Sequence, residues 1–208
     1  MNFFQKTLVK IASIFYPIKF HGVENVCDSN TLICCNHLSM IDVLYLARIF
    51  DKDTNFLAKK EVVENKIFGR FLRNFGAIPI DRENVDIRSI LTIVKVLKNG
   101  KNLVIFPEGT RNKTRSTELL PFKGGSMVFA VKTKKPILPI IIYKKARIFR
   151  KNHLILGKPF YLEEFYGKEL DDQTIFCMEE SVRNKMVELQ AQLQEIVSLK
   201  KNKRRNDK

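Results

Sequence analysis

The sequence lacks an apolar run long enough to cross a membrane, because none approaches the roughly 18 consecutive residues that a spanning helix needs. The apolar N-terminal stretch MNFFQKTLVKIASIFYPIKF is interrupted by Lys6, Lys10 and Lys19. It also lacks a small-residue cleavage site, so we do not interpret it as a signal peptide. Nothing in the sequence therefore indicates export.

Cysteine is scarce as well. The four cysteines are Cys27, Cys34, Cys35 and Cys177. No CxxC pair or Cys/His cluster has the spacing of a zinc site, so we expect no metal centre. Reduced, buried thiols in a cytosolic chain are the favoured interpretation.

Acidic residues are few compared with basic ones. The chain has 22 Asp+Glu against 37 Lys+Arg, which gives a net charge of +15. The last nine residues, KKNKRRNDK, hold six basic residues and one acid, so the rest of the chain carries +10. A body this basic indicates an anionic partner: nucleic acid, a membrane surface or a phosphorylated substrate.

The order of predicted elements indicates an α/β fold. The 208 residues suit one domain, and three segments, 31–35, 103–106 and 137–143, read as buried strands. Further strands are predicted at 55–58, 77–80 and 153–156, and helices at 3–16, 39–48, 60–75, 87–97, 125–132 and 174–199. We expect a mostly parallel or mixed central sheet flanked by helices, because fully apolar strands alternate with helices.

The chain divides into four predicted segments. Residues 1–20 form an N-terminal amphipathic helix, and residues 21–170 form the α/β domain. Residues 171–199 form a C-terminal helix packed on that domain, and residues 200–208 form a basic, disordered tail.

The N-terminal helix allows two interpretations. Phe4, Leu8, Ile11 and Phe15 recur at helical spacing, and Pro17 marks the predicted end. The helix could pack on the domain core, or it could lie in a bilayer interface with its apolar side chains buried and its lysines at the headgroups. The basic body favours the second interpretation.

The stretch TLICCNHLSMIDVL places His37 just past a predicted strand, with Asp42 five residues later. Ligands of α/β sheets bind at the carboxyl ends of strands. A loop that folds His37 back onto Asp42 would fix the tautomer of the imidazole and leave its other nitrogen free to take a proton. The alternative is that Ser39 and Asp42 cap a helix and that His37 is an ordinary loop residue.

A second segment, VIFPEGTR, also ends an apolar strand. Pro107 stops the pairing of the strand, and Gly109 allows a close backbone approach to a ligand. Thr110 and Arg111 offer a hydroxyl and a guanidinium that suit phosphate oxygens. Two shorter segments give weaker signals. GAIPIDR at 76–82 is a short strand that ends in the charged pair Asp81–Arg82, which could also be a surface ion pair. LPIII at 138–142 is an apolar strand whose internal Pro139 could mark a sheet edge or a bulge.

Taken in order, NHLSMID, GAIPIDR, FPEGTR and LPIII resemble the four sequence blocks of the glycerolipid acyltransferases, specifically the 1-acylglycerol-3-phosphate acyltransferases. AKKE at 58–61 and PFKGG at 121–125 also look like family segments, and the resemblance covers about residues 20–160. Pro79 departs from the aromatic or aliphatic residue that is common in the family.

The resemblance implies a reaction. A fatty acyl group would pass from a thioester, carried by coenzyme A or by acyl carrier protein, to the 2-hydroxyl of lysophosphatidic acid, giving phosphatidic acid. His37 would act as the general base and Asp42 would orient it. No further cofactor and no metal would be needed.

The resemblance also implies roles for other residues. The predicted phosphate-binding residues are Arg82, Arg111, Lys59 and Lys123, and the predicted substrate-positioning residues are Glu108, Gly109 and Thr110. Glu108 could hold the acceptor's glycerol hydroxyl or form an ion pair with Arg111. The enzyme would meet an anionic membrane surface at the cytoplasmic face of the cell membrane, as a peripheral or monotopic protein.

Three alternatives remain open at this stage. The acceptor could be glycerol 3-phosphate or a lysophospholipid with a larger headgroup. The net charge also fits a nucleic-acid-binding module, but no binding motif appears and the phenylalanines lie in apolar patterns, so no nucleic acid is expected. A membrane-binding protein without activity is the third alternative, and the intact His37, Asp42 and Glu108 argue against it.

Overall fold

A computed structural model describes residues 3–27, 30–50, 54–66, 68–81, 87–114, 118–123 and 125–206. Its centre is a seven-stranded sheet of order β1-β7-β6-β2-β5-β3-β4. The strands are β1 (Ile18–His21), β2 (Leu32–Cys35), β3 (Thr54–Lys59), β4 (Ala77–Ile80), β5 (Asn102–Ile105), β6 (Ile137–Ile142) and β7 (Asn152–Leu156). All neighbouring pairs are parallel except β6 and β7, which are antiparallel. The predicted mixed α/β sheet is confirmed.

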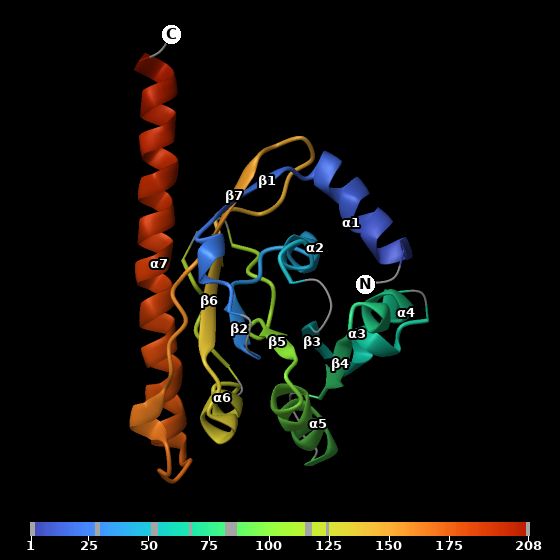
Figure 1. The fold of residues 1–208 in the computed structure, drawn as a ribbon, viewed down its shortest axis with the longest axis vertical. Helices are drawn as coiled ribbons and strands as arrows, with labels where there is room; N and C mark the ends of the chain where they lie inside the picture. Colours follow the sequence, from blue (N-terminus) through green and yellow to red (C-terminus); the bar gives the residue numbers. More distant parts are fainter. Residues whose placement is uncertain are drawn as a thin grey trace.

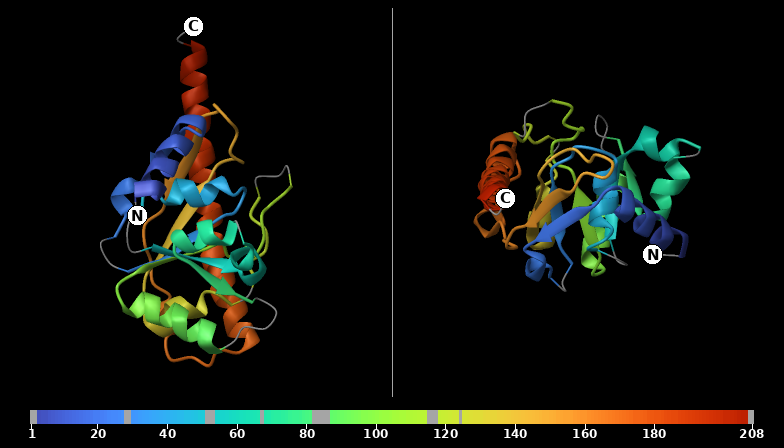
Figure 2. Two further views of the ribbon diagram at one scale, coloured as in Figure 1. Left: turned by 90° about the vertical axis from the view of Figure 1, so that its right-hand side faces the viewer. Right: turned by 90° about the horizontal axis from the view of Figure 1, so that it is seen from above.

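Helices cover both faces of this sheet (Figures 1 and 2). They are α1 (Phe3–Phe15), α2 (Ile41–Leu46), α3 (Lys60–Glu64), α4 (Phe68–Asn74), α5 (Ile87–Lys98), α6 (Val128–Thr133) and α7 (Asp172–Asn206), with 3-10 turns at Val23–Asn25 and Glu163–Phe165. One core joins the sheet to α5, α6 and α7, and a second joins the other face to α2. A third, smaller cluster packs α1 on α2.

The two cores explain why the inner strands are apolar throughout. Alternate side chains of a strand point to opposite faces of the sheet. In β2, Leu32 and Cys34 enter the core beneath α5, α6 and α7, whereas Ile33 and Cys35 enter the core beneath α2. All four are fully buried, which explains why apolar residues follow one another along this strand without alternation.

The structure changes some predicted boundaries. α1 ends at Phe15, just before Pro17, close to the end predicted for the helix over 3–16. The segment 1–20 is nevertheless not all helix, because residues 18–21 form β1. The helix predicted over 60–75 is two helices, α3 and α4. α7 continues to Asn206, so residues 200–206 are helical rather than the start of a disordered tail. Their sequence, KKNKRRN, contains no Gly or Pro to end the helix.

Pro139 also differs from the expectation that a strand proline marks an edge. It lies in β6, an inner strand, opposite Cys34 of β2. Its carbonyl accepts a hydrogen bond from the amide of Gly157, just past the end of β7. The missing N–H of Pro139 therefore faces the end of the β6–β7 ladder, where regular pairing has stopped.

None of the described helices combines the length and apolarity of a membrane-crossing segment.

Candidate active site

The candidate site lies where β2 and β5 end. These strands are parallel neighbours, with Cys34 opposite Ile105. The loops that follow them, which carry NHLSMID and FPEGTR, therefore leave the sheet side by side at its carboxyl edge. The amide of Asn112 donates to the carbonyl of His37 at 2.7 Å, so the two loops are joined directly.

His37 and Asp42 are in contact. Nδ1 of His37 lies 2.9 Å from Oδ2 of Asp42, as expected if the loop folds back onto the first turn of α2. The contact engages Nδ1, which leaves Nε2 for proton transfer. The His37 side chain is 15% exposed, and that of Asp42 is completely buried. The imidazole is thus open to a ligand on one side and anchored on the other.

Asp42 also organises the loop backbone. Its Oδ2 accepts hydrogen bonds from the amides of Leu38 and Ser39 at 2.6 and 2.7 Å, and its Oδ1 accepts one from the Ser39 hydroxyl at 3.0 Å. A buried carboxylate requires such partners, because water cannot solvate it. The two interpretations of Asp42, a partner of His37 and a partner of backbone amides near the helix start, therefore hold together.

The plane of the imidazole is set by an aromatic ring. Phe106, the residue after β5, stacks on His37 with ring centroids 4.0 Å apart and planes inclined by 20°. Phe106 is itself buried. With the Asp42 contact at one edge and the Phe106 ring on one face, the His37 ring has little freedom to rotate.

Glu108 joins three segments of the chain. Its Oε1 accepts from the amide of His37 at 2.9 Å, and its Oε2 accepts from the amide of Leu120 at 3.0 Å. Burial raises the pKa of the Glu108 carboxyl, although the two amides act in the opposite direction. The ion pair with Arg111 that was one alternative is not formed between these two described residues, because both carboxylate oxygens face backbone amides.

Two asparagines complete the support of the loops. The Asn36 side chain is buried and bonds both the amide and the carbonyl of Ile142, at 2.7 and 3.0 Å. It thereby ties the end of β2 to the end of β6. Asn112 bonds the carbonyl of Glu118 through its side chain at 2.8 Å. Sequence analysis missed these roles, and those of Phe106 and Leu120, because the spacing of residues in the sequence does not show which side chains and backbone groups the folded loops bring together.

The predicted phosphate-binding residues are partly brought together. Lys59 is the last residue of β3, beside β5, and Arg111 precedes the Asn112 amide that bonds His37. The backbone amide of Lys123 bonds the carbonyl of Pro107 at 2.8 Å. All three side chains are exposed at the same edge of the sheet. Arg82 lies outside the described residues.

The remaining predicted residues lie in the FPEGTR turn. Gly109 has φ +70°, a left-handed conformation that glycine adopts without strain, and Thr110 next to it is exposed. Within the ranges that the structure describes, no three His, Cys, Asp or Glu side chains gather as a metal site would require. His21 and His153, which have no partner near them in the sequence, pair with each other across β1 and β7 at 3.1 Å.

Comparison with known proteins gives a consistent assignment. A family model described as acyltransferase matches residues 17–143. The chain is 32% identical to a Bacillus subtilis protein named 1-acyl-sn-glycerol-3-phosphate acyltransferase, over 94% of this chain and 99% of the relative. A coconut protein of the same name is 34% identical over 75% of this chain, but the match spans only 51% of that relative.

A solved structure also resembles this one. The crystal structure of the 1-acyl-sn-glycerophosphate (LPA) acyltransferase from Thermotoga maritima superimposes with a TM-score of 0.64 at 26% identity, over 90% of this chain and 80% of that one. The strand order and the contact between His37 and Asp42 thus occur on a fold that this relative shares. The chain belongs to the acyltransferase family.

Proposed function

We propose that the protein transfers a fatty acyl group from a thioester to the 2-hydroxyl of 1-acylglycerol 3-phosphate, giving phosphatidic acid. The names of the relatives support this acceptor. The observation that carries the chemistry is the Nδ1–Oδ2 contact of 2.9 Å between His37 and Asp42 at the carboxyl edge of the sheet. Such a pair can activate a hydroxyl without a protein nucleophile.

The proposed reaction has two steps. Nε2 of His37 takes the proton of the acceptor hydroxyl as its oxygen attacks the thioester carbonyl, and Asp42 stabilises the imidazolium that forms. The tetrahedral intermediate then expels the thiolate, which receives the proton from His37. The ester bond forms, the thioester bond breaks and the imidazole returns to its neutral form. A thioester is already an activated acyl group, so we propose that no cofactor takes part.

Cationic side chains around the site suit the phosphate of the acceptor. Arg111 and Lys59 reach water at the edge that holds His37, and Lys123 follows the segment bound by Glu108. A guanidinium can bind two phosphate oxygens at once, so we assign Arg111 the larger share of acceptor binding. Arg82 keeps its proposed phosphate role from the sequence pattern alone.

Glu108, Gly109 and Thr110 have the proposed role of positioning the substrate. For Glu108 this role is indirect, because its oxygens hold the amides of His37 and Leu120. We further propose that the protein works at the cytoplasmic face of an anionic membrane, which its net charge of +15 would attract. The acyl donor is coenzyme A thioester or acyl carrier protein thioester.

The experiment that tests this function uses purified protein with labelled acyl-coenzyme A or acyl carrier protein thioester. Each donor is offered with lysophosphatidic acid or with glycerol 3-phosphate. We expect phosphatidic acid from lysophosphatidic acid and none from a folded His37→Ala variant. Product from glycerol 3-phosphate alone would keep the mechanism and change the acceptor. No product with any pair, or normal turnover by His37→Ala, would refute the proposal.

A further inference from the structure

Exposed apolar side chains gather at one place on the molecule. The connection between β6 and β7 presents Ile148 and Phe149, which are 56% and 68% exposed. The C-terminal half of α1 lies beside it and exposes Ile11, Ile14 and Phe15. The Phe15 and Phe149 rings are 5.5 Å apart, and the Phe149 amide donates to the Phe15 carbonyl at 2.7 Å. We call these five side chains the apolar tip.

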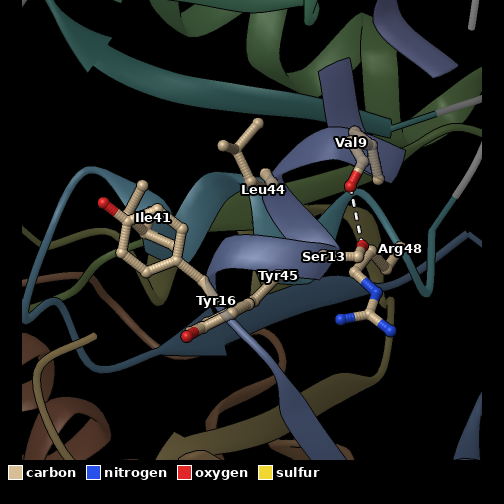
Figure 3. A pocket seen from close by; sticks show the side chains of 8 residues that line it. Val9, Ser13, Tyr16, Ile41, Leu44, Tyr45 and Arg48 are labelled. Carbon is tan, nitrogen blue, oxygen red and sulfur yellow. Dashed lines mark hydrogen bonds between the residues drawn. The ribbon is translucent and has the colours of Figure 1, made fainter. Parts of the chain in front are cut away.

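The apolar residues of α1 fall into two groups. Leu8, Val9 and Ala12 pack against α2, which fixes the helix to the domain. Figure 3 shows this side from close by, where Val9 and Ser13 line a small hollow together with residues of α2. Ile11 and Ile14 lie on the side that α2 does not cover. α1 therefore carries apolar side chains that do not pack on the domain.

Basic residues flank the part of the tip that lies between β6 and β7. Five basic residues flank Ile148 and Phe149 in the stretch KKARIFRK, and all five are exposed: Lys144, Lys145, Arg147, Arg150 and Lys151. No acidic residue occurs between Glu118 and Glu163. Exposed apolar side chains flanked by Lys and Arg match the interface of an anionic bilayer, where the apolar groups enter the acyl region and the cations meet phosphates.

The tip lies at the edge of the sheet that holds the candidate active site. β6 is parallel to β2, so residues 143–151 leave the sheet where His37 does, and Asn36 bonds Ile142 at that point. β1 runs opposite to β6, so its start, next to the end of α1, lies at the same edge. Figure 1 shows the β6–β7 connection next to α1.

The backbone at the tip is strained. Phe149 has φ +55°, a left-handed conformation that few residues other than glycine adopt. A strained conformation persists where something else requires it. Here it holds an aromatic ring in water, where burial offers no gain. Among the other residues whose side chains the structure describes, exposed apolar ones such as Leu91 on α5 and Phe176 on α7 lie on separate elements.

We propose that the apolar tip inserts into the surface of an anionic lipid bilayer and presents the carboxyl edge of the sheet to lipid-borne substrate. This inference rests on the proposed function for its purpose, because the acceptor would reside in the bilayer. Insertion of the β6–β7 connection together with α1 into a bilayer can be measured without any substrate.

Fluorescence measures insertion directly. The chain has no tryptophan, so a Phe149→Trp variant carries a single one at the tip. With vesicles of phosphatidylglycerol and phosphatidylcholine, we expect its emission to shift to the blue and to be quenched by lipids brominated in their acyl chains. The matched control Phe176→Trp, at a residue that is 58% exposed in the first turns of α7, is expected to show neither change. An unquenched Phe149→Trp protein on vesicles that it has bound would overturn the proposal.

Sedimentation with the same vesicles measures affinity. The double variant Ile148→Ser with Phe149→Ser should bind roughly tenfold or more weakly, because two apolar side chains no longer leave water. The control Leu91→Ser with Phe176→Ser removes as many exposed apolar side chains and should bind normally. An equal loss in both pairs would overturn the proposal. The proposal would also be overturned if the tip variant bound vesicles as well as the unmodified protein does and if DNA competed with this binding.

These results are separable from the enzymatic proposal. The His37→Ala variant should bind vesicles as the unmodified protein does. The tip variant should still transfer acyl groups to a short-chain lysophosphatidic acid below its micelle concentration, while losing activity on acceptor in vesicles. Insertion without transfer to any acceptor would remove the proposed function and leave the tip. Acyl transfer without insertion of the tip would remove the tip proposal and leave the proposed function.

Discussion

The substitution Asp42→Asn separates the two tasks of Asp42. An asparagine oxygen at the place of Oδ2 can still accept from Leu38, Ser39 and Nδ1 of His37, and its NH2 group can donate to the Ser39 hydroxyl, which now bonds Oδ1. The hydrogen bonds therefore survive, and only the negative charge is lost. We expect a folded protein whose unfolding free energy falls by no more than about 1 kcal/mol.

The loss of activity should be much larger. The carboxylate contacts the ring at 2.9 Å, and unit charges about 4 Å apart attract each other by roughly 4 kcal/mol in surroundings of effective dielectric constant about 20. This attraction stabilises the imidazolium only when His37 has taken the proton. Its removal should slow acyl transfer about a thousandfold, because each 1.36 kcal/mol changes the rate tenfold.

The assay follows thiol release from acyl-coenzyme A or acyl carrier protein thioester at saturating lysophosphatidic acid, with urea unfolding of the same sample. The comparison variant is Asp42→Ala, which removes the acceptor for two amides, a hydroxyl and His37 and should lower both stability and rate. An Asp42→Asn protein with at least a tenth of the normal kcat would refute the electrostatic role. Loss of stability equal to that of Asp42→Ala would refute the claim that the hydrogen bonds survive.

Two further predictions concern groups away from the reacting atoms. Glu108→Gln places an NH2 group against the amide of His37 or Leu120, which should lower stability by about 1–2 kcal/mol; an unchanged urea midpoint would contradict this. Burial lowers the pKa of His153 to about 4, whereas an unfolded His titrates near 6.5. The unfolded chain therefore binds the proton first, and stability should fall as the pH drops from about 6.5 towards 4. Urea unfolding at pH 7 and pH 5 should show a smaller decline for His153→Gln; an identical decline would refute the assignment to His153.

The inner part of the fold could be predicted because burial on two faces leaves a simple pattern. β2, β5 and β6 are apolar at nearly every position, and each was found within about one residue. β1 was missed because its four residues, IKFH, follow an apolar helix and lie at the sheet edge, where they are only partly buried. No local signal distinguishes such a strand from the end of a helix. Its pairing with β7 comes from the far end of the domain.

The candidate site also has one part that the local sequence predicts and one part that it does not. The contact between His37 and Asp42 follows from their spacing and from the position of a strand end, both of which can be read locally. The clamp that Glu108 forms on the amides of His37 and Leu120 cannot, because it joins positions 71 and 12 residues away in the chain. An acid in a turn looks like a substrate ligand or an ion-pair partner in sequence. Its backbone partners appear only when the loops are placed in space.

The pairing of β1 with β7 has a consequence for how the chain is made. Ile18 lies opposite Asn152, so β1 leaves the ribosome long before β7, its neighbour in the described sheet, exists. At 5–20 residues per second, this interval is on the order of 10 s. During that time α1 is tethered to no strand of the sheet, and the membrane contact proposed for its exposed side chains does not require the finished sheet. Attachment to the membrane would then precede completion of the domain, and β1 amides would be the last in the sheet to gain protection from hydrogen exchange.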